Sequence, residues 1–208
     1  MEKLMAIVMA GGKGGRLEMN IEKPLLKIGG SPFVKKVVDA CLGSSYIREV
    51  FVAVSKNTPA TESYLISLSL PRVRTIQTPG FGYHDDMKAA IRAVGNKNRF
   101  IVIAADIPSL TSEIIDEVAL RFIESGKPAL AVFAPKDLFE SAGLKPTFVV
   151  KVMGEDCVPC GINALDGSKV DDEGYLEEEE MVLRDQRVCA NINTLTDFKV
   201  YQTWTGEK

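Results

Sequence analysis

Short runs of apolar residues alternate along most of the chain with longer segments whose apolar residues lie three or four positions apart. A continuous apolar run is typical of a strand buried on both faces, and the wider spacing is typical of a helix with one buried face. The runs predict strands at 4–10, 49–54, 73–76, 100–105 and 129–133. The wider spacing predicts helices that open at Pro32, Pro59, Tyr83 and Thr111 and end at Gly43, Leu68, Gly95 and Gly126.

Strands separated by helices in this way are joined by right-handed crossovers and form a mostly parallel sheet. The pattern therefore predicts an α/β fold with a Rossmann-like three-layer α/β/α arrangement. No internal repeat, low-complexity stretch or linker divides the sequence, so we expect a single domain over residues 1–208.

The pattern weakens after Pro135. Residues 148–152 predict another strand, and residues 156–169 predict irregular structure. Seven of the ten residues from 171 to 180 are acidic, which favours a solvated surface loop. We expect a strand again at 188–192 and a terminal helix from Thr196.

Composition narrows the class of protein. Of the 208 residues 46% are apolar, and 25 basic against 28 acidic residues give a net charge of −3. These values exclude a chain that is disordered as a whole and argue against nucleic acid as a partner, because sequence-independent binding needs a basic surface. No apolar run approaches the roughly 20 residues of a membrane span. The N-terminal run breaks at Gly11 without a signal-peptide cleavage site, and four cysteines are too few for a disulfide scaffold, so we expect a cytoplasmic protein.

A glycine-rich loop follows the first predicted strand. Residues 11–15 hold four glycines, and Lys13 and Arg16 add positive charge. Uncovered backbone amides can surround a phosphate chain beyond the carboxyl end of a strand, and arginine can grip phosphate oxygens with two parallel bonds. The candidates for phosphate binding are Gly11, Gly12, Gly14 and Gly15, with Lys13 and Arg16. The alternative is a flexible turn, since the loop lacks both the Lys-Ser/Thr end of a Walker loop and the last glycine of the dinucleotide fingerprint.

Asp106 directly follows the predicted strand at 100–105, on the same edge of the sheet as the glycine loop. Mg²⁺ prefers one or two carboxylates together with phosphate oxygens and water, so Asp106 is a candidate magnesium ligand. The alternative is an aspartate that caps its own turn before Pro108.

A second glycine-containing segment, 78–87, joins a predicted strand to a helix. Gly80 and Gly82 leave backbone amides free, and Asp85 or Asp86 can accept a hydrogen bond from a base or a ribose. The alternative is a loop whose two acids favour the positive end of the helix dipole. His84 is the single histidine, which excludes a histidine-based triad or a multi-histidine metal site.

Two later segments carry weaker signals. Cys157 and Cys160 have the spacing of a zinc or redox pair, but Cys41 and Cys189 lack the paired spacing of a four-thiolate site, so we expect neither function. Asn191 and Asn193 share one face of the predicted strand and are candidate site residues. Alternatively Asn193, Thr194 or Thr196 caps the terminal helix.

The residues around the glycine loop form a compound pattern. An apolar strand leads into Ala10-Gly11-Gly12-Lys13-Gly14-Gly15-Arg16, and the pair Lys23-Pro24 follows about ten residues on. This pattern resembles the signature of the Rossmann-like nucleotidyltransferases, except that many members have Thr or Ser where this chain has Gly15. The resemblance implies a nucleotidyltransferase fold, a nucleotide-binding loop that includes Ala10, a Lys23 that contacts phosphates and a metal-binding Asp106.

Further segments resemble the archaeal adenosylcobinamide-phosphate guanylyltransferases. They are 9–16, 22–25, 55–59, 80–83 with Asp86, and 180–182 leading to 191–194. The resemblance implies GTP as donor, Mg²⁺ as cofactor and a phosphorylated cobamide precursor as acceptor. An acceptor phosphate is anionic near pH 7 and needs no general base. For the acceptor side we expect Pro159 and Asn163, in a loop at 158–163, together with Asn191 and Asn193.

Three other functions remain open. The nearest is a molybdenum-cofactor guanylyltransferase or another nucleotidyltransferase with a different phosphorylated acceptor. The second is a nucleotide-binding protein without catalysis, and the third is a dehydrogenase-like Rossmann protein. A homodimer is an open alternative for the assembly.

Overall fold

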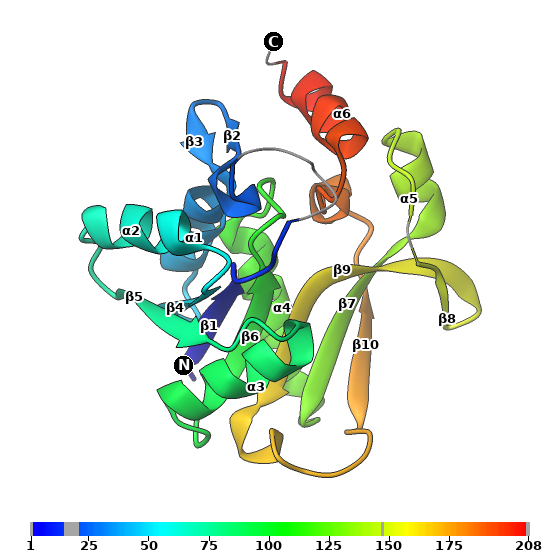
Figure 1. Cartoon of the computed structure of the whole chain (residues 1–208). Helices are drawn as coiled ribbons and strands as arrows, with labels where there is room; N and C mark the ends of the chain where they lie inside the picture. The colour runs from blue at the N-terminus through cyan, green and yellow to red at the C-terminus, as the bar shows by residue number, and fades with distance from the viewer. Residues whose placement is uncertain (1, 15–20, 147, 207–208) are drawn as a thin grey trace.

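The computed structural model describes residues 2–14, 21–146 and 148–206. Within these ranges eight strands form one sheet in the order β10-β7-β9-β6-β1-β4-β5, with β8 paired to β9 (Figure 1). The strands are β1 (Leu4–Met9), β4 (Ile47–Ser55), β5 (Val73–Thr78), β6 (Arg99–Ala104), β7 (Ala129–Pro135), β8 (Val150–Val152), β9 (Glu155–Asp166) and β10 (Glu178–Val182). The pairs β1–β4, β1–β6, β4–β5 and β7–β10 are parallel, and β9 runs antiparallel to β6, β7 and β8. The predicted mostly parallel sheet is confirmed.

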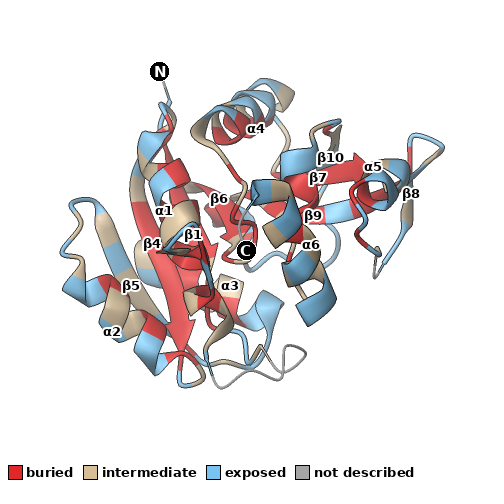
Figure 2. Ribbon diagram, turned by 90° about the horizontal axis from the view of Figure 1, so that it is seen from above, coloured by how far each residue is buried: buried red, intermediate tan, exposed pale blue. Residues whose placement is uncertain are grey.

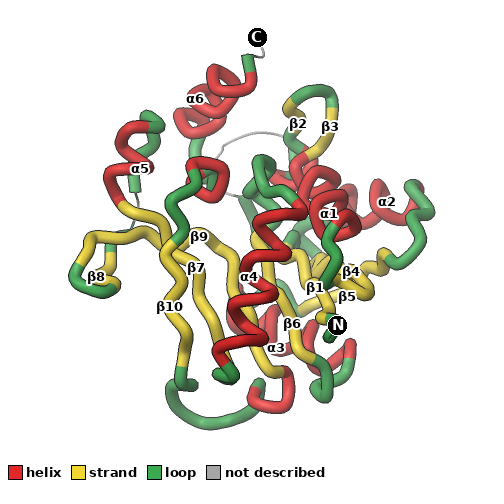
Figure 3. Tube along the Cα trace, turned by 180° about the vertical axis from the view of Figure 1, so that it is seen from behind, coloured by secondary structure: helices red, strands yellow, loops and turns green. Residues whose placement is uncertain are grey.

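Helices cover both faces of the sheet. They are α1 (Phe33–Gly43), α2 (Pro59–Ser67), α3 (Tyr83–Val94), α4 (Ser112–Ser125), α5 (Lys136–Ser141) and α6 (Leu195–Thr205). The buried apolar residues of α1 other than Phe33, together with those of α2 and α4, belong to one core cluster. The buried apolar residues of α3 belong to another cluster on the opposite face. Figure 3 shows α4 crossing the face of the sheet opposite α3. The predicted three-layer α/β/α arrangement is confirmed. None of the helices in the described ranges has the length and apolar character to span a bilayer.

The alternation of side chains along β1 explains why the sequence shows an unbroken apolar run. Leu4, Ala6 and Val8 point into the cluster under α1 and α4, whereas Met5 and Ile7 point into the cluster under α3. These five residues are at most 4% exposed. Successive side chains of a strand face opposite sides, so a strand between two helix layers must be apolar at every position. Figure 2 shows these central strands as the buried interior of the molecule.

The predictions for residues 156–169 and 171–180 were wrong in part. Residues 155–166 form the long strand β9, in which Val158, Cys160, Ile162 and Ala164 are buried at every second position. The intervening Pro, Gly and Asn resemble loop residues in the sequence. The acidic segment ends in strand β10, which lies at the edge of the sheet. Charged side chains are common on edge strands because they discourage pairing with another chain.

The strand predicted at 188–192 is absent from the described structure. Residues Gln186–Cys189 form a 3-10 helix, η3, because the Asp185 side chain accepts a hydrogen bond from the Arg187 amide at its start. The following residues pass beside the sheet edge, where the Ile192 amide donates to the carbonyl oxygen of Asp106 at 3.0 Å. Two other short 3-10 helices, η1 (Lys23–Leu25) and η2 (Gly167–Lys169), and a small hairpin of β2 (Lys27–Ile28) and β3 (Ser31–Pro32) complete the described elements.

Candidate active site

The site lies at the edge of the sheet where β1, β4 and β6 end. The hydrogen-bond ladder continues beyond the strands, since the Ala10 amide donates to Ala53 at 2.8 Å and the Ala105 amide donates to Met9 at 3.1 Å. The glycine loop and Asp106 therefore follow the ends of two neighbouring strands and lie side by side. Because β1 lies between β4 and β6, this edge is the point where the strand order reverses, the usual position of a ligand in an open α/β sheet.

The first part of the glycine loop is held against the segment that follows β4. The Gly11 carbonyl oxygen accepts hydrogen bonds from Ser55 Oγ at 2.7 Å and from Asn57 Nδ2 at 3.4 Å. At Gly14, with φ +60°, an added Cβ would also lie 3.2 Å from the Cβ of Lys23. Glycine at position 14 thus allows both the backbone conformation and the close approach of the lysine. Gly15 and Arg16, both predicted to bind phosphates, lie outside the described residues.

Lys23, Asp106, Asn193 and Asn191 form a chain of polar contacts. The ammonium group of Lys23 forms an ion pair with Asp106 Oδ2 and donates to Asn193 Oδ1 at 3.0 Å. Asn193 Nδ2 in turn donates to Asn191 Oδ1 at 2.8 Å. The Lys23 and Asp106 side chains are 14% and 18% exposed, so little water screens their charges. The structure thus brings together four candidates that lie as far apart as positions 23 and 193.

The second carboxylate oxygen of Asp106 is suited to a metal ion. Asp106 Oδ1 is buried and has no hydrogen-bond partner. A buried polar atom without a partner costs free energy, and a carboxylate oxygen is a ligand that Mg²⁺ prefers. Among the described residues no group of three or more His, Cys, Asp or Glu side chains can hold a metal ion. A Mg²⁺ ion at Asp106 would therefore depend largely on phosphate oxygens and water for its other ligands.

Lys23 is positioned by its neighbour Glu22, a residue with no predicted role. The Glu22 carboxylate accepts hydrogen bonds from the amides of Ala60 and Thr61 and from Thr61 Oγ1, at 2.6–2.8 Å. These amides lie in the first turn of α2, whose N-cap residue, Thr58, makes no side-chain cap. Glu22 thus caps α2 from a distant part of the chain and fixes the segment that carries Lys23. The sequence gives no signal of this contact, because Thr58 directly before Pro59 is itself a common capping residue.

Two cavities meet at Asp106. The first, of about 220 Å³, is lined by Ala10, Gly12, Gly14, Lys23, Asp106 and Asn193, among others. The second, of about 430 Å³, lies between the glycine loop and the segment before α3. Its lining includes Gly11, Gly12, Lys13, Asn57, Gly80, Gly82, Tyr83 and Asp86. The two cavities share Met9, Gly12 and Asp106, so a ligand that fills both passes along the glycine loop.

The predicted nucleoside loop is held by its own aspartate. Asp86 is 5% exposed, and its Oδ1 accepts a hydrogen bond from the Gly80 amide at 2.7 Å. At Gly80, with φ +73°, an added Cβ would lie 2.9 Å from Asn57 Nδ2. Asp86 therefore shapes the wall of the larger cavity as well as lining it.

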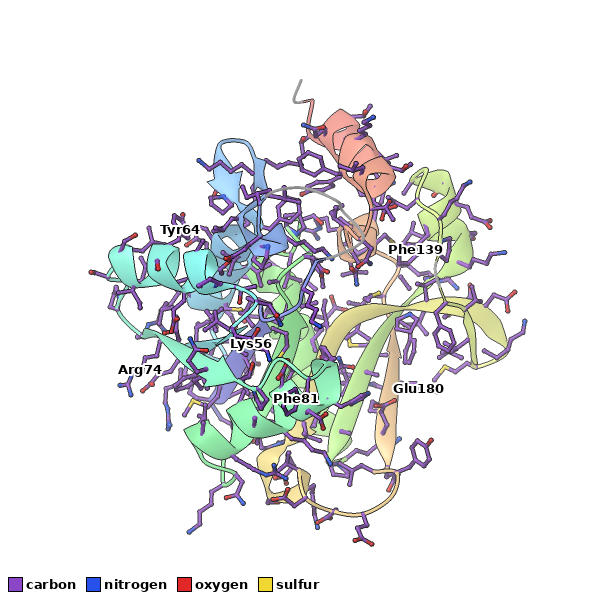
Figure 4. All side chains as sticks on the ribbon, viewed as in Figure 1. Lys56, Tyr64, Arg74, Phe81, Phe139 and Glu180 are labelled. Carbon is purple, nitrogen blue, oxygen red and sulfur yellow. The ribbon has the colours of Figure 1, made fainter. Side chains whose placement is uncertain are left out.

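Phe81, between the two glycines, is a large exposed side chain at the mouth of this cavity. It is 76% exposed, and Lys56 Nζ lies 6.0 Å from the centre of its ring. Figure 4 shows the two side chains close together beside the loop before α3.

The four predicted acceptor-side residues divide between two places. Asn163 lies on β9 and donates a hydrogen bond to Tyr83 Oη at 3.1 Å, beside the larger cavity. Burial raises the pKa of Tyr83 to about 12, opposed by this hydrogen bond and reinforced by the negative charge of Asp106. Pro159, Asn191 and Asn193 instead line a third cavity, of about 40 Å³. The predicted loop at 158–163 is wrong, because both Pro159 and Asn163 belong to strand β9.

Two smaller questions from the sequence are also answered. Thr194 caps α6, since Thr194 Oγ1 accepts from the Asp197 amide at 3.1 Å and Asp197 Oδ2 accepts from the Thr194 amide.

Cys157 and Cys160 lie in different core clusters, on opposite faces of β9. Side chains on opposite faces of one strand point away from each other, so Cys157 and Cys160 do not lie together in this structure.

Comparison with known proteins shows the family of the chain. A family model described as a MobA-like NTP transferase domain matches residues 6–169. The chain is 33% identical over 202 residues to the adenosylcobinamide-phosphate guanylyltransferase of Methanocaldococcus jannaschii, with 94% of each chain covered.

Solved structures show the same fold. CMP:2-keto-3-deoxy-manno-octonic acid synthetase complexed with CTP matches with a TM-score of 0.75 over 99% of both chains, at 15% identity. 4-Diphosphocytidyl-2C-methyl-D-erythritol synthase from Anaerococcus prevotii matches with a TM-score of 0.71 over 99% of this chain and 97% of that one, at 12% identity.

The fold, with a glycine loop, a lysine and an aspartate at the point where the strand order reverses, defines a nucleotidyltransferase. The chain belongs to the MobA-like NTP transferase family. Its resemblance to the adenosylcobinamide-phosphate guanylyltransferases, first indicated by the motifs, is confirmed over nearly the whole chain.

Proposed function

We propose that the chain transfers GMP from GTP to adenosylcobinamide phosphate, giving adenosylcobinamide-GDP and pyrophosphate. The observation that carries this proposal is the identity of 33% over 94% of the chain with a relative named for this activity. The polar chain from Lys23 to Asn191 and the two cavities beside it support the same reaction. A reaction that consumes GTP is expected in the cytoplasm.

The transfer forms one bond and breaks one. An oxygen of the acceptor phosphate attacks the α-phosphorus of GTP, and the bond from that phosphorus to the oxygen bridging to the β-phosphate breaks. Pyrophosphate leaves with the electron pair. A phosphate monoester has its second pKa near 6 and is already ionised at neutral pH. The protein therefore has to position two anions and neutralise charge rather than remove a proton.

The glycine loop is assigned to the triphosphate. Gly11, Gly12 and Gly14 line the two cavities together with Lys13, and we assign Gly15 and Arg16 to the same task from their sequence. We assign the larger cavity, with Gly80, Gly82 and Asp86, to the nucleoside. Its volume of about 430 Å³ lies in the range of small-molecule sites.

Asp106 would hold Mg²⁺ through its unpartnered Oδ1 atom. When bound, the ion neutralises charge on the phosphates. Lys23 stabilises the negative charge that develops on the leaving group. To do so its ammonium group exchanges the Asp106 carboxylate for a phosphate oxygen, and the Lys23–Asp106 ion pair keeps it within reach of that position.

The test is pyrophosphate release with Mg²⁺, each of the four nucleoside triphosphates in turn, and adenosylcobinamide phosphate as acceptor. We expect release with GTP and not with ATP, CTP or UTP. Adenosylcobinamide without its phosphate is the matched control acceptor and should give no release. Turnover with molybdopterin and not with the cobinamide would contradict the proposed acceptor, and tight GTP binding without turnover on any acceptor would indicate a non-catalytic binding protein.

A further inference from the structure

Three cavities lie along the active edge, and each is lined by one lysine among the described residues. Lys23 lines the first, Lys13 lines the second and Lys145 lines the third. Lys23 and Lys13 belong to the segments assigned to the donor triphosphate. Lys145 comes from the segment after α5, on the opposite side of Asn193 from the first cavity. The proposed function gives it no role.

The third cavity adjoins the reacting groups. Asn193 lines both this cavity and the first, and its side chain contacts Lys23 and Asn191. Pro159 of β9 and Phe139 of α5 line it as well, and Phe139 is labelled in Figure 4. Its volume of about 40 Å³ is several times the roughly 10–15 Å³ that one water molecule requires. It can therefore admit a group of the size of a phosphate, while the rest of an acceptor molecule stays outside.

The charges around the third cavity favour an anion. Lys145 is exposed, and it has no hydrogen bond or ion pair with any described residue. The carboxylate in the cavity, Asp197, is occupied at Oδ2 by the amides of Asn193 and Thr194 at 3.0 and 2.8 Å. Lys145 is thus a free cation, whereas the amides of Asn193 and Thr194 hold the Asp197 carboxylate and offset part of its charge.

The reaction chemistry calls for a cation in this position. A phosphate monoester that approaches a triphosphate brings negative charge toward negative charge, which costs free energy unless a cation offsets it. Lys13 and Lys23 are committed to the donor.

We infer that the third cavity is the subsite for the phosphate monoester of the acceptor, with Lys145 as the residue that binds it. This inference rests on the proposed function and deepens it. Lys145 then distinguishes a phosphorylated acceptor from the same molecule without its phosphate.

The experiment measures binding rather than turnover. Equilibrium dialysis with Mg²⁺ and the non-reactive donor α,β-methylene-GTP, followed by corrinoid absorbance, gives dissociation constants for adenosylcobinamide phosphate and adenosylcobinamide. For Lys145→Ala we expect the dissociation constant of the phosphorylated acceptor to rise about tenfold or more, and that of adenosylcobinamide to stay within about twofold. Lys145→Arg should preserve the difference between the two acceptors.

Lys136→Ala is the matched control, because Lys136 is a lysine of the adjacent helix α5 that pairs with Glu140 and does not line the cavity. It should change neither constant. Unchanged binding of the phosphorylated acceptor by Lys145→Ala, or an equal loss for both acceptors, would overturn the inference.

Inorganic phosphate separates this inference from the proposed function. If wild-type protein neither binds nor converts adenosylcobinamide phosphate, the proposed function fails. Titration of inorganic phosphate into protein saturated with the donor analogue then tests the subsite alone. If the dissociation constant of inorganic phosphate rises about tenfold in Lys145→Ala, the third cavity is still a phosphate subsite, for a different phosphorylated acceptor. If the constant does not rise, the inference is wrong.

Discussion

At the scale of single residues, the site is defined by what Lys23 contacts. Its ammonium group is shared between Asp106 and Asn193, while the other Asp106 oxygen is buried without a partner. A partly buried ion pair is stable only while both partners are present, because removal of one partner leaves the charge of the other uncompensated. Substitutions of these residues should therefore affect both folding and catalysis. The informative variants are those that keep the size of the side chain.

Asp106→Asn tests the metal assignment. The amide keeps the size of the side chain but removes the negative charge that Mg²⁺ and Lys23 both require. We expect kcat to fall by about 100-fold or more and the Mg²⁺ concentration for half-maximal turnover to rise. Pyrophosphate release across a Mg²⁺ titration measures both. Asp172→Asn, which changes an exposed carboxylate paired with Lys169, is the control; normal metal-dependent turnover in Asp106→Asn would contradict the assignment.

Two glycines of the cavity walls should respond in opposite ways to alanine. A Cβ at Gly12 would meet no atom within 4 Å, whereas at Gly80, with φ +73°, it would lie 2.9 Å from Asn57 Nδ2. We expect Gly80→Ala to lower the free energy of unfolding by about 1–2 kcal/mol. Gly12→Ala should leave it within about 0.5 kcal/mol but raise KM for GTP, because its methyl group enters the space assigned to phosphates. Urea unfolding and steady-state kinetics separate the two; equal stabilities would argue against the loop geometry at Gly80.

At the scale of elements, the cap on α2 links folding to catalysis. Glu22 replaces a local capping residue with three hydrogen bonds from the first turn of α2. Glu22→Ala should lower the free energy of unfolding by about 0.5–2 kcal/mol, which is the usual value of an N-cap. It should also lower kcat more than it raises KM for GTP, since Lys23 loses its support. Thermal unfolding and kinetics measure both effects.

Glu177→Ala is the control for this substitution, because Glu177 is a largely exposed acid with one long ion pair to Lys127. Glu22→Gln retains one strong acceptor oxygen and should recover part of both losses. If Glu22→Ala lowered stability without changing kcat, Glu22 would be a structural cap and not a positioning residue.

The sequence predicted the elements whose signals are local. The central strands were predicted within two residues of their observed ends, because burial on both faces makes them continuously apolar. The glycine loop and Asp106 were recognisable because both follow such strands. β9 was missed because Pro159, Gly161 and Asn163 occupy its less buried positions, and only its place between β6 and β7 explains them. Glu22 and Lys145 were missed because their roles depend on residues distant in the sequence.

At the scale of the whole molecule, burial of ionisable groups sets the alkaline limit of stability. Burial raises the pKa of Cys41 and of Cys189 from 9.0 to about 12. These groups stay protonated in the folded chain at pH values where the unfolded chain loses their protons. Their contribution to stability is therefore complete below about pH 9 and is lost as the pH rises toward 12.

We expect the free energy of unfolding to fall steadily as the pH rises above about 9, in the lower part of this window. Urea unfolding in the presence of a reductant measures it. Cys41→Ser is unsuitable as a test because it buries a hydroxyl, whereas Cys41→Ala keeps the site apolar and should reduce the pH dependence. A free energy that stayed constant over this range would contradict the burial of the thiols.

Asn193 lines both the first and the third cavity. While no nucleotide is bound, its side-chain oxygen accepts a hydrogen bond from Lys23. The two substrates should consequently bind in a compulsory order, with GTP first, because the triphosphate draws Lys23 away and frees the asparagine to turn toward the incoming acceptor. Initial rates should then give intersecting double-reciprocal lines, and adenosylcobinamide without its phosphate should inhibit uncompetitively against GTP. Parallel lines would instead require a covalent guanylyl-enzyme, and competitive inhibition would mean that the acceptor can enter before the nucleotide.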